Sequence, residues 1–208
     1  MEPTPALSQI HQNTPHGRNL QVDFSWKKFK GLITEKDSPE SKPAYIVDLQ
    51  TIKSPHLIFK HATDNTTFGT GTLHPISINA SCTISNRKTQ IKALKRFKTS
   101  YTHLSRAFSD TEDLMTMTWT SDSDFKTWDF ICLDEQLMPV AKFSANIWAV
   151  QKVGIIEFLG DKANSKEARE EIVVTGLTLF YCMLLRTSSI LSFFGAIFAR
   201  PGPIKQAP

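Results

Sequence analysis

The hydrophobic and polar positions along the chain change pattern twice. From Asp23 to about residue 160, short runs of β-branched and aromatic residues alternate with turn residues such as Asp, Asn and Gly. The run EIVVTGLTLFYCMLLR (171–186) follows, and beyond its first turns it is apolar on all sides of a helix. The pattern therefore predicts a series of strands followed by one buried helix.

Eight runs have the length and composition of strands. They are residues 44–49, 56–62, 66–73, 81–85, 114–120, 127–134, 139–145 and 153–160. The run LMTMTWT (114–120) alternates strictly, so Met115, Met117 and Trp119 face one side and its Leu and Thr residues the other. About ten strands in succession, with no helix between them, predict an antiparallel barrel or sandwich and not a doubly wound sheet.

The helix, predicted at about residues 164–186, begins with a capping-box pattern. Asn164 can act as N-cap with Glu167 three residues later, and acidic residues in the first turns suit the positive end of the helix dipole. A membrane span needs about 20 apolar residues, and extending the run to Ala199 would bury Arg186. We therefore expect a mainly β fold, a closed antiparallel barrel of about 12 strands that encloses the helix and leaves no exposed sheet edge.

The order of these elements resembles that of the tubby C-terminal-like superfamily, which includes the tubby domain, the phospholipid scramblases and the LURP-one-related proteins. WKKFKGLITEKDSPESKPAYIVDL (26–49) is similar to its opening strands. WDFICLDEQLMPVAKFSANIWAVQKVGIIEFLG (128–160), followed by EEIVVTGLTLFYCMLLR (170–186), is similar to its ending. The resemblance covers residues 21–186, is greatest to fungal members of the group, and implies a barrel with a C-terminal apolar helix inside it.

The resemblance also implies a function. Tubby domains bind phosphoinositides, and scramblase relatives associate with membranes. We therefore expect a non-enzymatic module that binds anionic phospholipid, phosphoinositide-like in type, at a membrane surface. The alternative is a protein-interaction or structural domain with no lipid ligand. The resemblance implies no cofactor, and no motif of the chain matches the lipid-contacting residues of the family.

Basic residues gather in two segments that suit such a ligand. Residues 87–98, RKTQIKALKRFK, hold six basic residues and no acidic one, and Trp and Phe flank the basic residues of WKKFK (26–30). Each Lys or Arg near an acidic membrane contributes about 1 kcal/mol. The alternative is a solvated barrel edge whose lysines block unwanted strand pairing. The candidate lipid-binding residues are Arg87, Lys88, Lys92, Lys95, Arg96, Lys98, Lys27, Lys28 and Lys30.

Composition adds a location to this picture. The formal net charge of +4 permits attraction to an anionic surface without requiring it. The cysteines at positions 82, 132 and 182 are far apart and lie in apolar or strand-like runs, so we expect buried free thiols. The N-terminus shows no basic region followed by an apolar one, so a secretory signal is not expected. These features predict an intracellular, cytoplasmic protein that can lie peripherally at a membrane.

The two ends differ from the barrel region, which we place at residues 21–189. Residues 1–20 are rich in Pro, Gln, Asn and His, so we expect a flexible tail. Residues 190–208 begin with a mostly apolar stretch, ILSFFGAIFA, that is too short to span a bilayer. This extension is expected either to fold back as a cap on the barrel or to lie in a membrane interface.

Other motifs do not indicate catalysis or metal binding. FGTGTLH (68–74) lacks the Gly-Lys-Ser/Thr ending of a phosphate loop, so its glycines are better explained by a bend or bulge in a strand. SDSDFKTWD (121–129) lacks the Gly and Glu of a calcium loop and reads as a solvated turn. The six histidines show no local ligand spacing, and His103 has no partner nearby in sequence. We expect no metal, no specific nucleic-acid partner and no enzymatic activity.

Overall fold

The computed structural model describes residues 19–25, 28–36, 42–74, 77–94, 99–123, 127–146 and 152–198 of the chain. Its strands are β1 (Asn19–Ser25), β2 (Lys30–Glu35), β3 (Pro43–Leu49), β4 (Leu57–His61), β5 (Thr67–Leu73), β6 (Ala80–Ile84), β7 (Arg87–Ala93), β8 (Ser100–Ser105), β9 (Met115–Ser123), β10 (Thr127–Leu133), β11 (Pro139–Asn146) and β12 (Lys152–Phe158). A 3₁₀ helix, η2 (Asp161–Asn164), and one long helix, α1 (Lys166–Phe198), follow them.

The eight predicted strands all form, and the basic segment begins as the strand β7. In β9, Met117 and Trp119 are fully buried, so the predicted alternation is confirmed. The sequence patterns did not predict β8, and the barrel begins earlier in the chain than predicted. Asn19, the first residue of β1, lies inside the predicted tail and pairs with Glu157 of β12.

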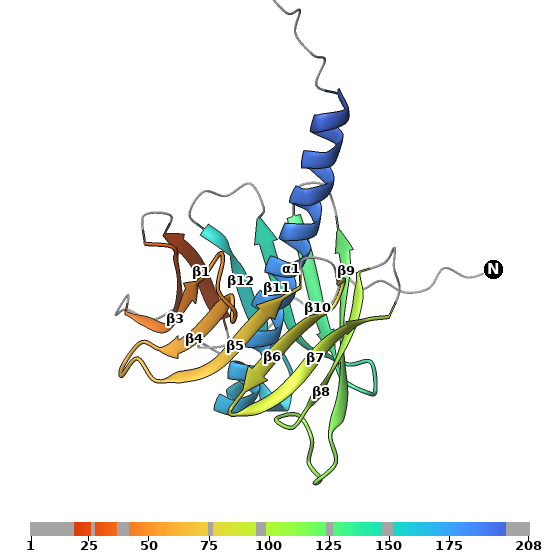
Figure 1. Ribbon diagram of the computed structural model, residues 1–208. Coiled ribbons are helices and arrows are strands. Elements are labelled where there is room, and N and C mark those ends of the chain that lie inside the picture. The colour runs from red at the N-terminus through yellow and green to blue at the C-terminus, as the bar shows by residue number, and fades with distance from the viewer. Residues whose placement is uncertain are drawn as a thin grey trace, which may run out of the picture.

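The strands form a closed antiparallel barrel in which each strand pairs with its neighbours in sequence. The ring closes at β1, where Leu20 lies opposite Ile156 of β12 on one side and Glu35 of β2 on the other. Figure 1 shows the strands surrounding the lower part of the helix. The predicted fold, a closed 12-strand barrel with a single C-terminal helix, is therefore confirmed.

Helix α1 fills the barrel because residues 172–180, after its charged first turns, have no polar face. Every residue from 170 to 180 is buried, and the buried side chains of the strands pack around this stretch as one core. A helix that is apolar on all sides must be surrounded by protein, and the closed sheet meets that requirement. The apolar run thus lies in the barrel interior, as predicted.

Both ends of the helix differ from the prediction. The N-cap is Ser165, whose Oγ accepts a hydrogen bond from the backbone N–H of Ala168 at 3.3 Å, while Asn164 ends η2. At the other end, the polar residues after residue 186 do not stop the helix. Thr187 Oγ1 donates to the carbonyl of Met183 at 3.0 Å, which satisfies the hydroxyl within the helix. The helix therefore continues to Phe198.

Residues 190–198 form the end of α1, which leaves the barrel at one end and does not fold back over it (Figure 1). The helical form suits the interfacial alternative, which stays a prediction. Among the described residues, no helix meets the length and apolarity needed to cross a membrane. Residues 1–18 and 199–208 lie outside the described part, so the predicted tail and the last part of the extension stay predictions.

The glycines of β5 let the helix approach the wall. A Cβ at Gly69 would overlap Val174, and one at Gly71 would overlap Thr178. Between Gly69 and Thr67 the pairing with β4 shifts by one residue, as in a β-bulge. The predicted bulge is present beside Gly69, whereas Gly71 pairs in regular register, and close packing against α1 is a reason for both glycines.

Replacing Leu179 with Asp should unfold the barrel, because Leu179 is 0% exposed and an unpaired buried charge costs about 3–5 kcal/mol of a total stability of about 5–15 kcal/mol. Leu185→Asp is the matched control on the same helix, since Leu185 is 48% exposed. Thermal unfolding followed by circular dichroism measures both. Equal melting temperatures for the two variants would contradict the enclosed helix.

The thiols of Cys82, Cys132 and Cys182 are free and buried, as predicted. Burial raises the pKa of the Cys82 thiol to about 12 and also raises the pKa values of Cys132 and Cys182. We expect a thiol reagent such as DTNB to modify them at the rate of unfolding, because the thiolate is the reactive form. Rapid reaction in the folded protein at neutral pH would contradict this burial.

Candidate functional site

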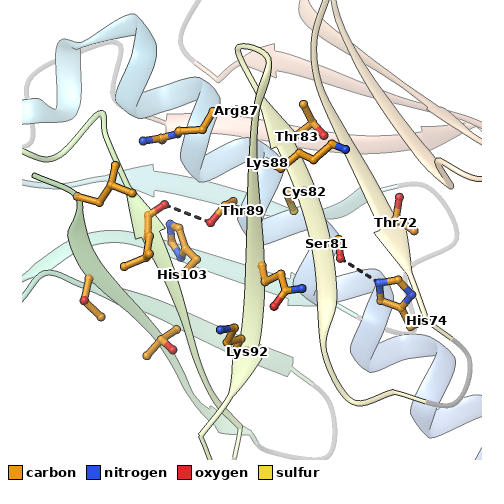
Figure 2. A pocket seen from close by; sticks show the side chains of 15 residues that line it. Thr72, His74, Ser81, Cys82, Thr83, Arg87, Lys88, Thr89, Lys92 and His103 are labelled. Carbon is orange, nitrogen blue, oxygen red and sulfur yellow. Dashed lines mark hydrogen bonds between the residues drawn. The ribbon is translucent and has the colours of Figure 1, made fainter.

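The barrel wall parts between β7 and β8. These strands pair through Lys92 with Thr102 and Ala93 with Tyr101, at one end only. By contrast, β6 follows β7 as far as Arg87, and β9 follows β8 along its full length. Where the ladder ends, Thr89 Oγ1 donates to the carbonyl of Leu104 at 3.2 Å, a side-chain bond across the gap (Figure 2).

A groove of about 690 Å³ lies at this gap. Its rim comes from outward-facing side chains of β5 to β9 and the adjoining loops, most of which carry hydroxyl, amide or amino groups. Its floor includes side chains that face the barrel interior, namely Cys82, Arg87 and His103. The described residues that line it are Thr72, His74, Ser81, Cys82, Thr83, Arg87, Lys88, Thr89, Gln90, Lys92, Thr102, His103, Leu104, Leu114 and Thr116. The groove thus runs over the outer wall and deepens into it where β7 and β8 part.

Three of the predicted lipid-binding residues line this groove, and all lie on β7. Lys88 and Lys92 are exposed, and neither forms an ion pair within the described part of the chain. Arg87 turns inward from the same strand. Among the described residues that line the groove, none is an aspartate or a glutamate. The groove is therefore basic at its rim, with hydroxyl groups around the lysines.

The structure does not bring the second basic segment to this groove. Lys30 begins β2 and pairs with Asp48 of β3 at 3.3 Å, and Lys28 is exposed just before it. In the strand order, β3 to β6 separate β2 from β7 in one direction and β1 with β12 to β8 in the other, so β2 lies across the barrel. Lys27, Lys95, Arg96 and Lys98 lie outside the described residues, and their predicted role stays a prediction.

Behind the groove, Glu171 of α1 binds two wall residues. Its Oε2 lies 3.2 Å from Nη2 of Arg87, and its Oε1 lies 3.2 Å from Nε2 of His103. The Glu171 side chain is 1% exposed and that of His103 is 0% exposed. Buried charges are costly unless they are paired, and here one carboxylate serves both partners. Sequence analysis gave His103 no partner, because the two residues of this pair are far apart in the chain.

A second glutamate–histidine pair lies next to the first along the helix. Oε1 of Glu170 is 3.5 Å from Nε2 of His61 on β4 and 3.8 Å from Nζ of Lys166. Burial raises the pKa of the Glu170 carboxyl above its ordinary value, and the charges of His61 and Lys166 offset only part of this effect. Neighbouring glutamates of α1 thus contact different sides of the barrel.

Within the described ranges, no group of three or more His, Cys, Asp or Glu side chains is placed to hold a metal ion. Comparison of the chain with protein-family models, curated proteins and solved structures gives no match. The resemblance to the tubby-like group therefore stays a hypothesis from the sequence. The groove and its buried cluster are the features from which a function can be argued.

Replacing Glu170 with Gln should stabilise the protein at neutral pH. A carboxyl whose pKa is raised on folding destabilises the fold when it is ionised, and this penalty is absent below about pH 4. We therefore expect the melting temperature of Glu170→Gln to exceed that of the wild type at neutral pH and to match it in acid.

Glu167→Gln is the control for this experiment. Hydrogen bonds from the helix backbone and from Ser165 lower the pKa of the exposed Glu167 carboxyl, so its ionised form stabilises the fold. This variant should lose stability at neutral pH and none in acid. The same sign of change for both variants would show that burial does not control the ionisation of Glu170.

Proposed function

We propose that this protein is a non-enzymatic module that binds the headgroup of an anionic phospholipid in the groove at β7. The observation that carries the proposal is the placement of Arg87, Lys88 and Lys92 in one groove whose described lining includes no acidic side chain. Phosphate oxygens accept hydrogen bonds from Lys, Arg and hydroxyl groups, and the rim and floor of the groove together supply all three kinds of donor.

The magnitude of the electrostatic attraction indicates a peripheral and reversible interaction. Each basic residue near an anionic surface contributes about 1 kcal/mol, so Lys88 and Lys92 together supply about 2 kcal/mol. Arg87 contributes less, because Glu171 already pairs with it. If residues 95–98 lie at the same surface, their three basic residues add to this attraction. Binding should then weaken as salt screens these exposed charges.

The sequence supports the same ligand class from a different direction. The chain resembles tubby-like proteins, and phosphoinositide binding is what that resemblance implies. Free, buried cysteines suit an intracellular location, and we place the protein at the cytoplasmic face of an anionic membrane. In this proposal, the apolar end of α1 lies in the membrane interface.

A protein ligand is the second candidate, and one feature favours it. Leu104 and Leu114 at the rim of the groove are about half exposed, beside Lys88 and Lys92. An acidic peptide with an apolar residue would complement this surface, since it offers both charge pairing and apolar burial. In the lipid proposal, the same leucines face the apolar part of the bilayer surface.

Changing Lys88 and Lys92 together to Gln should weaken binding to vesicles that contain phosphatidylserine or a phosphoinositide by about 30-fold, from the loss of about 2 kcal/mol. The matched control is the pair Lys28→Gln and Lys30→Gln, which removes the same charge from the other side of the barrel. Vesicle co-sedimentation at low and high salt measures the binding. If both double variants lose the same amount of vesicle binding, the interaction depends on net charge and not on the groove. If the wild type does not bind vesicles, the protein ligand is favoured.

A further inference from the structure

The floor of the groove contains a polar atom that lacks a partner within the described residues. Nδ1 of His103 is buried and forms no hydrogen bond there, although the side chain lines the groove. Nη1 of Arg87 is also buried without a hydrogen bond there, and Arg87 is another residue of the groove lining. Buried polar groups in folded proteins are nearly always paired, so unpaired ones indicate a place for water, an ion or a ligand.

Glu171 fixes the orientation of both side chains. It holds Nε2 of His103 and Nη2 of Arg87 at 3.2 Å each, so the other nitrogens are free to contact something else. Because Nε2 faces a carboxylate, it carries the hydrogen. Nδ1 is then an acceptor when the ring is neutral and a donor when the ring is charged.

The charges around His103 decide which ligand fits. With a neutral ring, the charges of Arg87 and Glu171 cancel, and a buried anion beside them would be unbalanced. With a charged ring, the cluster carries a net charge of about +1 and can balance an anion. The other titratable groups of the groove are His74, Lys88 and Lys92 at the rim and the thiol of Cys82, and burial raises the pKa of this thiol to about 12, so it stays neutral. Opposite His103, β9 presents the uncharged side chain of Met117.

We propose that the groove ends in an oxyanion subsite, formed by His103 and Arg87, that binds a phosphate monoester group together with one proton. The proton comes from solvent and is held on Nδ1 of His103, which then donates to a phosphate oxygen, while Nε2–H stays on Glu171. Lys88 and Lys92 attract the anion at the rim. This inference deepens the proposed function, because the monoester can belong to a lipid headgroup or to a free small molecule.

Isothermal titration of the full chain with glycerol 3-phosphate, at about pH 5.5 and about pH 8 and in two buffers of different ionisation enthalpy, counts the protons taken up. The ester itself titrates near pH 6, so the wild type is compared with His103→Gln, whose amide can still donate to Glu171. We expect the affinity of the wild type to fall about tenfold more than that of the variant between these pH values. His61→Gln, which changes the histidine of the other glutamate–histidine pair, 3.5 Å from Glu170 and outside the groove lining, should behave as the wild type.

Equal proton uptake and equal pH dependence in the wild type and His103→Gln would overturn the proposal, and so would the absence of ester binding at both pH values. If His103→Gln does not fold, nitrogen-15 chemical shifts of the histidine rings in the wild type give the same answer. Addition of the ester should convert Nδ1 of His103 from the unprotonated to the protonated form. An unchanged shift under saturating ester would refute the subsite.

Vesicles separate the two sources of the monoester and the two proposals. Phosphatidic acid carries a phosphate monoester, whereas phosphatidylserine carries none. Tighter binding to phosphatidic acid vesicles in acid, lost in His103→Gln, would support a lipid source. Binding of the soluble ester without binding to any vesicle would support the subsite and refute the membrane function. Vesicle binding with the same pH dependence in the wild type and His103→Gln would support the membrane function and refute the subsite.

Discussion

The fold depends on enclosing a helix that has no polar face. Residues 170–180 of α1 are all buried, and only a wall on every side can bury them. The closed barrel supplies that wall, and small residues at the contacts let it fit closely. Gly69 and Gly71 of β5 lie against the helix, and Gly176 of the helix lies against Trp119 of β9. Trp119 Nε1 also donates to Thr175 Oγ1 at 3.2 Å, so its polar atom is satisfied within the core.

Charged residues at the start of α1 set how the helix is rotated inside the barrel. Arg169 reaches Glu35 of β2 at 3.1 Å, Glu170 faces His61 of β4, and Glu171 faces β7 and β8. Buried ion pairs add little net stability, because desolvation offsets their attraction. Their orientation is specific, however, since a rotated helix would leave the buried carboxylates of Glu170 and Glu171 without their partners. We interpret this ring of pairs as the feature that fixes one packing of an otherwise uniformly apolar helix.

The same ring explains why the groove lies where it does. Arg87 turns into the barrel to reach Glu171, and β7 and β8 pair only beyond it, at the end near Lys92. The groove at this gap borders the basic outer surface of β7, and its lining includes Arg87 and His103 of the buried cluster. In the proposed function, a ligand in the groove contacts both the surface lysines and residues that position the central helix. Under the same proposal, ligand binding and the packing of α1 share Arg87 and His103, which connects the site to the core.

Local patterns in the sequence determined the strands, the buried helix, the alternation in β9 and the burial of the thiols. Each of these follows from residue spacing along one element, where side-chain direction repeats every two residues in a strand and every 3.6 in a helix. Sequence also picked out Lys88 and Lys92, because clustered charge is visible without a fold. Tertiary structure alone decided the groove. The pairing of His103 with Glu171 and the parting of β7 from β8 depend on which strands meet when the barrel closes. The ion pair of Lys30 with Asp48 is decided in the same way, because contacts between distant segments leave no periodic signal in the chain.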